Sequence, residues 1–462
     1  MRLCGDGPRI LCVVGTENAL KFLFRSGWGE SLSLARRVEK EGNLVRFSIV
    51  EPMAQSVGLG LIERTKDLPG SISWADVVVF DSNSFDMPKE AQRAIVAGKN
   101  VVGSSEFAGH LEKDRLFAAD LARGAGIEVN NFRRFEGKGA WQQARKFLVD
   151  QEGGWVWKPN GEGEICSTYV AKDVDEMFRM LNYFERLHTK EKQPPDFILT
   201  PVIEGDEVST EAWFSGNEFF LANNTIERNR VFPGDLGEKV GCAGNVVWVA
   251  PDPTECPLFD ELLSPLNLAL KKARYRGPID VNAIIESESG SPVFLEFTPR
   301  FGYDAIFALS HLVKDDLAGL LADTAMGRRW TGKVITDQFA GALGITVPPF
   351  PDEPNPDESG VPIFGFNPEE VDPRVSPLEV RLINGEPETS GPTGVPFIVS
   401  ATGESPDAAM AAAEKTDIKI PLMRYRNDLP EAIQEVYEKL CETKWIKGPE
   451  KRTVFGRHSY ER

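Results

Sequence analysis

The first hundred residues alternate short apolar runs with amphipathic stretches. The apolar runs predict buried strands at residues 9–15, 44–50, 75–80 and 100–103. Helical spacing at residues 31–41, ended by Gly42 and Asn43, and at residues 89–97 predicts helices between them. Strands that alternate with helices are typical of a parallel sheet covered on both faces.

The pattern changes further along the chain. Ser104 and Ser105 are positioned to cap a helix that continues to about Gly124. From Trp155 onward, alternating or apolar strands separated by short turns predominate. These strands are expected at residues 155–158, 197–203, 208–214, 218–224, 245–251, 278–285 and 292–297, with helices at 174–187 and 259–273. The pattern indicates an antiparallel-rich α+β region.

A proline-rich stretch at residues 347–362 reads as a surface loop or linker. Beyond it we expect strands at 378–383 and 396–402 and helices at 406–415 and 428–441. The fold class is therefore α/β and α+β multidomain. We expect an N-terminal open parallel α/β domain (1–108), a central domain (109–330) and a small C-terminal α+β domain (331–462).

Composition narrows the class of protein. The chain has 462 residues, with 52 basic against 70 acidic side chains and a net charge of −18. This balance argues against nucleic-acid binding, which needs clustered lysine and arginine. No run of about 18 apolar residues predicts a membrane span. The six cysteines are scattered, and the N-terminus does not resemble a secretory leader. We expect a cytoplasmic protein with small-molecule substrates, as a monomer or dimer.

Two acids stand in apolar strand patterns. Asp280 and Glu296 flank an expected hairpin turn at residues 287–291. A buried carboxylate is costly unless it is paired or bound to metal. Asn282 and Thr298 lie two residues from an acid, on the same strand face. These oxygen ligands suit Mg²⁺, although the pattern leaves open that each acid pairs with an arginine.

Three further residues suit a nucleotide phosphate and ribose. Arg300 has the planar fork that binds phosphate, although a salt bridge to Asp304 or another acid is an alternative. Lys158 ends a strand before the turn at residues 159–163, which suits a polyphosphate, although most such lysines are simply solvated. Glu207 can accept from ribose hydroxyls, although an exposed glutamate is the simpler interpretation. Each residue alone is weak evidence for a nucleotide site; the informative feature is their order along the chain, a lysine, a glycine turn, a glutamate, then two acids and an arginine.

That order resembles ATP-grasp enzymes, and among them the phosphoribosylamine–glycine ligase family. The similar segments run through most of the chain, and the metal hairpin and hinge are the most specific of them. They are residues 110–129 (HLEKDRLFAADLARGAGIEV), 155–161 (WVWKPNG), 197–209 (FILTPVIEGDEVS), 275–285 (YRGPIDVNAII), 293–302 (VFLEFTPRFG) and 394–415. The resemblance implies a central ATP-grasp domain.

The resemblance also assigns residues to the nucleotide. Lys158 would contact the ATP phosphates, and Arg115 takes the position of the family's first ATP lysine. Pro201 would offer its carbonyl and Ile203 its N–H to adenine; proline lacks an N–H but keeps the carbonyl. Glu207 falls on the ribose contact.

The metal hairpin supplies the other assignments. Glu296 falls on the principal metal carboxylate and Asp280 on the first metal acid of the wider superfamily. Thr298 replaces the usual asparagine ligand. Arg300 falls on the phosphate arginine. The implied cofactors are ATP and Mg²⁺, or Mn²⁺.

The chain departs from the family where the acceptor is handled. The glycine-rich loop after the second lysine is here residues 161–169, and a glycine-rich substrate stretch is replaced by residues 238–251. The N-terminal glycine-rich turn shrinks to residues 14–20. Arg228 and Arg230 lie where the family handles substrate, with a solvated loop as the alternative.

The resemblance implies an ADP-forming carboxylate–amine ligase that acts through an acyl phosphate. Lys158 and Arg300 would be the catalytic cations, and the loop at residues 159–167 a lid. Three hypotheses stay open at this point. They are a phosphoribosylamine–glycine ligase of purine synthesis, a related ligase that joins a different carboxylate and amine in specialised or nucleotide-modifying metabolism, and a non-catalytic nucleotide-binding descendant.

Overall fold

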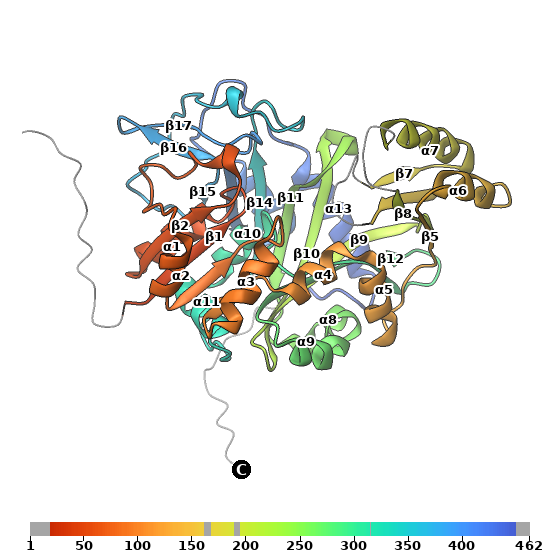
Figure 1. Ribbon diagram of the computed structural model, residues 1–462, viewed down its shortest axis with the longest axis horizontal. Helices are drawn as coiled ribbons and strands as arrows, with labels where there is room; N and C mark the ends of the chain where they lie inside the picture. The colour runs from red at the N-terminus through yellow and green to blue at the C-terminus, as the bar shows by residue number, and fades with distance from the viewer. Residues whose placement is uncertain (1–18, 161–167, 189–194, 315, 450–462) are drawn as a thin grey trace, which may run out of the picture.

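The computed structural model describes residues 19–160, 168–188, 195–314 and 316–449. Its N-terminal part is a parallel sheet in the order β2-β1-β3-β4, at the left of Figure 1. The elements are β1 (Lys21–Ser26), α1 (Leu32–Lys40), β2 (Leu44–Ile49), η1 (Pro52–Ala54), α2 (Leu68–Trp74), β3 (Val77–Phe80), α3 (Met87–Val96) and β4 (Asn100–Val102). The parallel sheet expected from the sequence is confirmed.

The first strand among the described residues was not predicted from the sequence. Strand β1 is the run KFLFRS, five of whose six residues are buried. The strand expected at residues 9–15 falls outside the described residues, as does most of the expected glycine turn at 14–20. The glycine-bearing turn that follows β1, from Gly27 to Gly29, leads into α1. This turn becomes important for the substrate cavity.

A second sheet lies at the right of Figure 1, in the order β5-β8-β6-β7, with all neighbours antiparallel. Its elements are β5 (Arg133–Glu136), α6 (Ala140–Leu148), β6 (Trp155–Pro159), β7 (Tyr169–Ala171), α7 (Val174–His188) and β8 (Asp196–Pro201). Aromatic rings join the helices to the sheet. Trp157 stacks on Phe184 with ring centroids 4.3 Å apart, and Trp141 on Phe197 at 4.6 Å.

The central sheet has eight antiparallel strands in the order β13-β12-β9-β10-β11-β14-β18-β15. Its strands are β9 (Gly205–Phe214), β10 (Phe219–Phe232), β11 (Leu236–Val249), β12 (Gly277–Glu286), β13 (Pro292–Thr298), β14 (Phe339–Ile345), β15 (Val375–Pro377) and β18 (Phe397–Gly403). Strands β10 and β11 have 14 residues each. They form a longer hairpin, joined by η2 (Pro233–Asp235), than the sequence pattern predicted.

The part beyond residue 330 shares this sheet. Strands β14, β15 and β18 continue it past β11, while the hairpin of β16 (Val380–Ile383) and β17 (Glu386–Thr389) stands apart. The remaining elements are η5 (Pro356–Glu358), α12 (Pro406–Ala413) and α13 (Leu429–Cys441). The expected domain boundary near residue 330 therefore falls within a continuous sheet, and the three-domain division stays a prediction.

Two expected helices are divided. Residues 104–124 form α4 (Glu106–Lys113) and α5 (Arg115–Gly124), because Asp114 is extended and its carboxylate caps α5. Ser105 caps α4 as expected. Residues 259–273 contain α8 (Pro257–Leu262), η4 (Ser264–Leu266) and α9 (Asn267–Ala273), preceded by η3 (Pro253–Glu255). Pro265 breaks this stretch because it lacks an N–H for a continuous helix.

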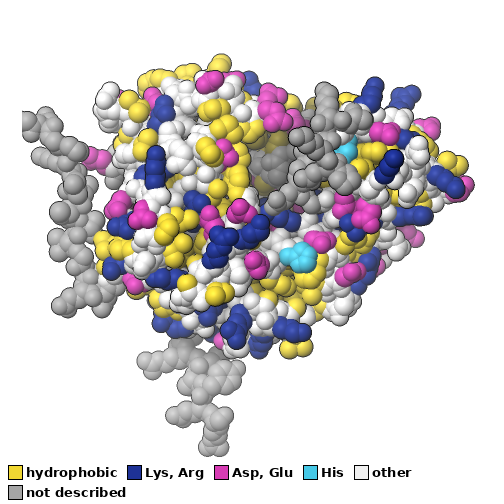
Figure 2. All heavy atoms as spheres, in the orientation of Figure 1, with side chains coloured by type: hydrophobic (Ala, Val, Ile, Leu, Met, Phe, Trp, Pro, Cys, Tyr) yellow, Lys and Arg dark blue, Asp and Glu magenta, His cyan; other side chains and the backbone are white. Residues whose placement is uncertain are grey.

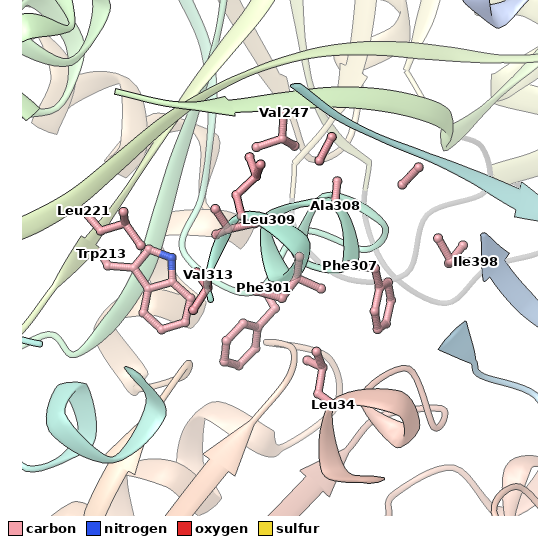
Figure 3. Packing of buried hydrophobic residues seen from close by; sticks show 14 of the residues in the cluster. Leu34, Trp213, Leu221, Val247, Phe301, Phe307, Ala308, Leu309, Val313 and Ile398 are labelled. Atoms are coloured by element: carbon pink, nitrogen blue, oxygen red, sulfur yellow. The ribbon is translucent and has the colours of Figure 1, made fainter. Parts of the chain in front are cut away.

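One hydrophobic core joins the N-terminal, central and C-terminal parts. Helix α10 (Ala305–Leu312) lies at its centre, followed by α11 (Leu317–Ala325). Figure 3 shows Leu34 of α1 pointing toward Phe301 and Phe307, while Leu309 and Val247 lie on the side of the central sheet. Within the described residues, no helix is long and apolar enough to cross a membrane.

Candidate functional site

The expected metal hairpin forms on the central sheet. Strands β12 and β13 pair so that Asp280 lies opposite Thr298 and Asn282 opposite Glu296. Side chains two residues apart on a strand share a face, so the four oxygen-bearing side chains gather on one side of the sheet. The Asn282 amide donates to Asp280 Oδ2 at 3.1 Å. The structure thus brings together the residues that the sequence assigned to metal.

The start of α5 reaches this hairpin. Arg115 is the first residue of the helix, and Asp114 caps it by accepting from the N–H groups of Leu116 and Phe117. The guanidinium of Arg115 donates to Glu296 Oε2 at 3.0 Å and to the carbonyl of Pro159 at 2.8 Å. Arg115 therefore connects the metal hairpin with the strand that carries Lys158.

Lys158 lies on β6, close to charges from four other segments, which carry Glu296, Arg115, Lys239 and Glu207. Burial lowers the pKa of its ammonium, the Glu296 carboxylate opposes this, and Arg115 and Lys239 lower it further. Lys239 stands on β11, and sequence reasoning missed it because only the long β10–β11 hairpin carries it here. Two lysines and an arginine beside the carboxylates of Glu296 and Glu207 form a cationic group suited to the phosphates of a nucleotide.

Glu207 lies at the start of β9, on the same side of the site. Burial raises the pKa of its carboxyl, and the Glu296 carboxylate adds to this, whereas the cations Lys239, Lys158 and Arg228 lower it. The side-chain amide of Asn229 lies 3.5 Å from Glu207 Oε1. Glu207 is therefore a half-buried acceptor next to the cationic group, as a ribose contact requires.

The segment between β8 and β9 carries the expected adenine contacts. The Pro201 carbonyl accepts from the Asn130 amide at 2.9 Å. A carbonyl oxygen has two lone pairs, so this bond leaves one position for a second donor. The N–H of Ile203 has no hydrogen-bond partner among the described residues. Both backbone groups therefore keep the hydrogen-bonding capacity that the hinge assignment needs.

The donor set of the hairpin fits a hard divalent cation. Burial raises the pKa of Asp280 to about 7; the Ser209 hydroxyl and Arg300 oppose this, and the carboxylates of Glu296 and Glu207 add to it. A bound cation would relieve that crowding of negative charge. No group of three or more His, Cys, Asp or Glu that could hold a metal occurs in the described part of the chain. Mg²⁺ commonly binds one or two carboxylates together with substrate phosphates, which this hairpin can provide.

Arg300 is held from the N-terminal side. Its Nε donates to Glu112 Oε1 at 2.8 Å, and the other oxygen of Glu112 accepts from the Asn83 amide at 2.7 Å. Although burial lowers the pKa of Arg300, the Glu112 carboxylate outweighs it and raises the pKa overall. The alternative expectation, a salt bridge to Asp304 or another acid, is therefore met by Glu112.

A cavity of about 570 Å³ opens beside the metal hairpin. Its wall is built from the N-terminal part (Glu30, Asp81), the central sheet (Glu227, Cys242), the segment after β13 (Arg300–Phe307) and the C-terminal part (Glu379, Arg424). Because the three parts enclose it together, this cavity is the natural place for the substrates that accompany a nucleotide.

The acids deep in this cavity were missed by sequence reasoning. Burial raises the pKa of Glu227 well above its usual range, and the carboxylates of Asp304 and Asp280 add to the shift. Burial likewise raises the pKa of Asp304, against hydrogen bonds from Cys242 and Asn245. Glu227 stands on β10 and Asp304 before α10, so only the folded topology brings them together.

Arg228 and Arg230 lie on β10 but do not line the cavity. Arg228 donates to the Ala432 carbonyl at 2.8 Å and lies 3.6 Å from Asp235. Arg230 donates to the Gly237 carbonyl. Both guanidinium groups thus make contacts within the protein, and their contact with substrate stays a prediction.

Comparisons with known proteins agree with this geometry. No protein-family model matches the chain. The phosphoribosylamine–glycine ligase of Caldanaerobacter subterraneus is 25% identical over 348 residues, which cover 72% of this chain and 79% of that enzyme.

Solved structures extend the likeness. The phosphoribosylamine–glycine ligase of Thermotoga maritima superposes with a TM-score of 0.69 at 18% identity, covering 88% of this chain and 100% of that one. The biotin carboxylase domain of Hydrogenobacter thermophilus 2-oxoglutarate carboxylase, solved with MgADP, ADP and bicarbonate, gives 0.62 at 13% identity, covering 92% and 99%. The chain therefore has the fold of ATP-grasp enzymes, and its sequence resembles that of the phosphoribosylamine–glycine ligases.

Proposed function

We propose that this protein is an ATP-dependent, ADP-forming ligase that joins a carboxylate to an amine through an acyl phosphate. The observation that carries the proposal is that the charges of Lys158, Glu207 and Arg300 all lie close to Glu296, which also lines the cavity. These residues come from three separate segments, and each has the chemistry that its position in an ATP-grasp site requires.

The residues that would bind the nucleotide form two sets, one for adenine and ribose and one for the phosphates. Ile203 and Pro201 would hold adenine by backbone groups, and Glu207 the ribose. Lys158 and Arg115 would hold the phosphates, and Lys239 is a further candidate because it lies near both Lys158 and Glu207.

The metal hairpin completes the site. Asp280 and Glu296 would bind Mg²⁺ or Mn²⁺, with Asn282 and Thr298 as further oxygen donors. When bound, the ion neutralises charge on the phosphates. Arg300, fixed by Glu112, would hold the transferred phosphoryl group in line with the carboxylate.

The reaction proceeds in two balanced steps. A carboxylate oxygen attacks the γ-phosphorus, the bond to the β-phosphate oxygen breaks, and ADP leaves. The amine nitrogen then attacks the acyl carbon, the carbon–oxygen bond to phosphate breaks, and phosphate and a proton are released. The enclosed cavity would protect the acyl phosphate from water.

Two candidate functions remain for the acceptor. A phosphoribosylamine–glycine ligase is favoured by the sequence similarity over most of the chain. A related ligase with another amine is favoured by the acidic lining of the cavity. A non-catalytic descendant is disfavoured because Lys158, Glu207, Glu296 and Arg300 are retained together.

The experiment is ADP release by the purified protein with Mg²⁺, ATP and glycine, with and without freshly formed phosphoribosylamine. Appearance of ADP only with both substrates, together with glycinamide ribonucleotide in the mass spectrum, would establish the first candidate. Stabilisation by ATP without turnover would retain the nucleotide site and direct the search to other carboxylate and amine pairs. Absence of both effects would contradict the proposed function.

A further inference from the structure

The turn between β1 and α1 places two carboxylates at the wall of the cavity. Its backbone N–H groups are already bonded to two carboxylates of the same chain. Gly27 and Ser31 donate to Asp81 at 3.1 and 3.2 Å, and Trp28 and Gly29 donate to Glu30 at 2.8 and 3.1 Å. Both carboxylates line the cavity.

This turn lies at the carboxyl ends of β1 and β3, where Asp81 directly follows β3. In open α/β sheets, ligands bind at this edge, and a phosphate commonly takes the N–H groups at the start of the helix. Here Glu30 and Asp81 accept from the N–H groups of the turn that precedes α1 and add negative charge at the entrance to the helix. A phosphate at this edge would meet these two carboxylates.

The rest of the lining has the same sign. Among the described residues that line the cavity, nine are acidic, three are arginines and none is a lysine. Arg300 is paired with Glu112, and Arg426 with Asp428 at 2.6 Å. Only Arg424 has no ion-pair partner among the described residues. In contrast, acidic and basic side chains are intermingled on the outer face seen in Figure 2.

One acid in the lining is incompletely bonded. Asp304 is 2% exposed, and its Oδ2 atom has no hydrogen-bond partner. The Glu227 carboxylate lies close enough to interact with it electrostatically. A buried, unpartnered carboxylate oxygen beside a second acid is costly, and an ammonium group would offer both of them donors and the opposite charge.

Aromatic rings add to this character. Trp28, Tyr303, Phe350 and Tyr425 line the same cavity. The face of an aromatic ring attracts a cation, most strongly for tryptophan. Carboxylates and rings together are the lining that recognises an organic ammonium ion.

We propose that the cavity binds, as the amine substrate, an organic cation that carries no phosphate: a diamine or a related compound with a second, protonated nitrogen. This inference rests on the proposed ligase function for the fate of the amine, but the binding itself does not require ATP. Glu227 and Asp304 hold the ammonium group, and Glu30 and Asp81 exclude phosphate. Arg424 remains for the carboxylate of the second substrate.

Calorimetric titration of the full-length protein without ATP tests this directly. The probes are putrescine and agmatine as cations, and ribose 5-phosphate and phosphoethanolamine as phosphorylated compounds of similar size. We expect at least one cation to bind, with affinity at least tenfold above that of either phosphorylated compound. Tighter binding of a phosphorylated compound, or no binding of either cation, would overturn the proposal.

Variants locate the binding. Glu227→Gln and Asp304→Asn should each weaken cation binding at least tenfold, whereas Glu261→Gln, an exposed acid on α8, should leave it unchanged. Thermal melting shows whether each variant is folded; if one is not, the other decides. Equal binding by a folded Glu227→Gln or Asp304→Asn protein would contradict the assignment.

ATP binding, measured separately by thermal stabilisation with Mg²⁺ and ATP, keeps the two proposals distinguishable. Cation binding without any effect of ATP would refute the ligase function and leave the cavity inference standing. An effect of ATP together with preference for ribose 5-phosphate would support the ligase and refute the cation site.

Discussion

Glu112 and Arg300 are joined at 2.8 Å across the boundary between helix α4 and the metal hairpin. Asn83 holds the second oxygen of Glu112, so the N-terminal part determines where Arg300 points. The phosphate arginine is thus positioned by a segment remote from the nucleotide strands in sequence.

This relationship predicts the effect of Glu112→Gln. The amide keeps the size of the side chain but loses the charge that holds the guanidinium. We expect kcat to fall about tenfold or more with little change in the KM for ATP, since misplacement of a transition-state group affects the chemical step. Steady-state ADP release measures this. Asp323→Asn, which removes a surface partner of Arg328, is the matched control and should leave kcat unchanged.

Lys158→Met should abolish ATP binding. The substitution retains much of the side-chain length but removes the buried ammonium from the cationic group, so the phosphates lose a charged donor. The measurement is the rise in melting temperature on addition of Mg²⁺ and ATP, which we expect to disappear. Lys172→Met, at an exposed lysine on the neighbouring segment, should retain the rise. Full stabilisation of the Lys158→Met protein by ATP would refute the phosphate assignment.

Lys239→Ala tests a residue that the fold, and not the sequence pattern, brings to the site. Loss of this charge near Lys158 and Glu207 should raise the KM for ATP about tenfold, equivalent to ~1.4 kcal/mol, and affect kcat less. The comparison is Lys272→Ala, at an exposed lysine near the end of α9. A KM equal to that of the unaltered protein would show that the hairpin lysine does not contact the nucleotide.

Substitutions of the two proposed metal-binding carboxylates should affect activity and stability differently. Glu296→Ala should abolish ADP release at any Mg²⁺ concentration, and unchanged activity would contradict the metal assignment. Asp280→Asn should also be inactive, yet it should unfold at higher denaturant concentration than the unaltered protein near pH 8. The reason is that burial and two neighbouring carboxylates raise the pKa of Asp280 to about 7, so its charged form is costly to the fold. Urea unfolding measures the gain, which we expect to be about 1 kcal/mol.

His311 predicts how stability depends on pH. Its Nε2 lies 2.9 Å from Ser400 Oγ, and burial, with a contribution from Arg37, lowers its pKa from 6.5 to about 4. The unfolded chain therefore binds a proton between pH 6.5 and 4 that the folded protein does not. The stability contributed by the neutral imidazole is present above pH 6.5 and is lost as the pH falls toward 4.

Replacement of His311 by glutamine should flatten this dependence. The loss of unfolding free energy between pH 7 and 4.5 should be smaller in the variant by about 1–3 kcal/mol. Urea unfolding of both proteins at the two pH values provides the comparison. Parallel pH profiles would show that His311 is not the titrating group.

The local sequence pattern was sufficient to predict site residues where chemically suitable side chains repeat every two positions along a strand. Asp280 and Glu296 were predicted to share a face because side chains repeat every two residues and a short turn fixes the pairing of β12 with β13. Lys158 and Glu207 followed from strand ends and from the family resemblance. In each case the neighbouring sequence determines the position of the side chain.

The remaining site residues were not predicted, because contacts between segments distant in sequence bring them to the site. Lys239 and Glu227 enter the site only because β10 and β11 continue past the expected strands. Polar sequences such as TIERNR lack the hydrophobic pattern that predicts a strand. Glu112 is an ordinary helical glutamate until α4 meets Arg300. Glu30 follows a strand, Lys21–Ser26, that the pattern did not predict.

Because β14 and β18 continue the central sheet past β11, the chain cannot be divided near residue 330 without exposing a sheet edge. A chain cut near residue 330 would leave β11 as an edge strand, with a row of unpaired N–H and C=O groups and buried residues such as Val246 and Trp248 uncovered. Such a fragment would pair with other copies of itself. The two halves therefore have to be inherited, and expressed, as one polypeptide.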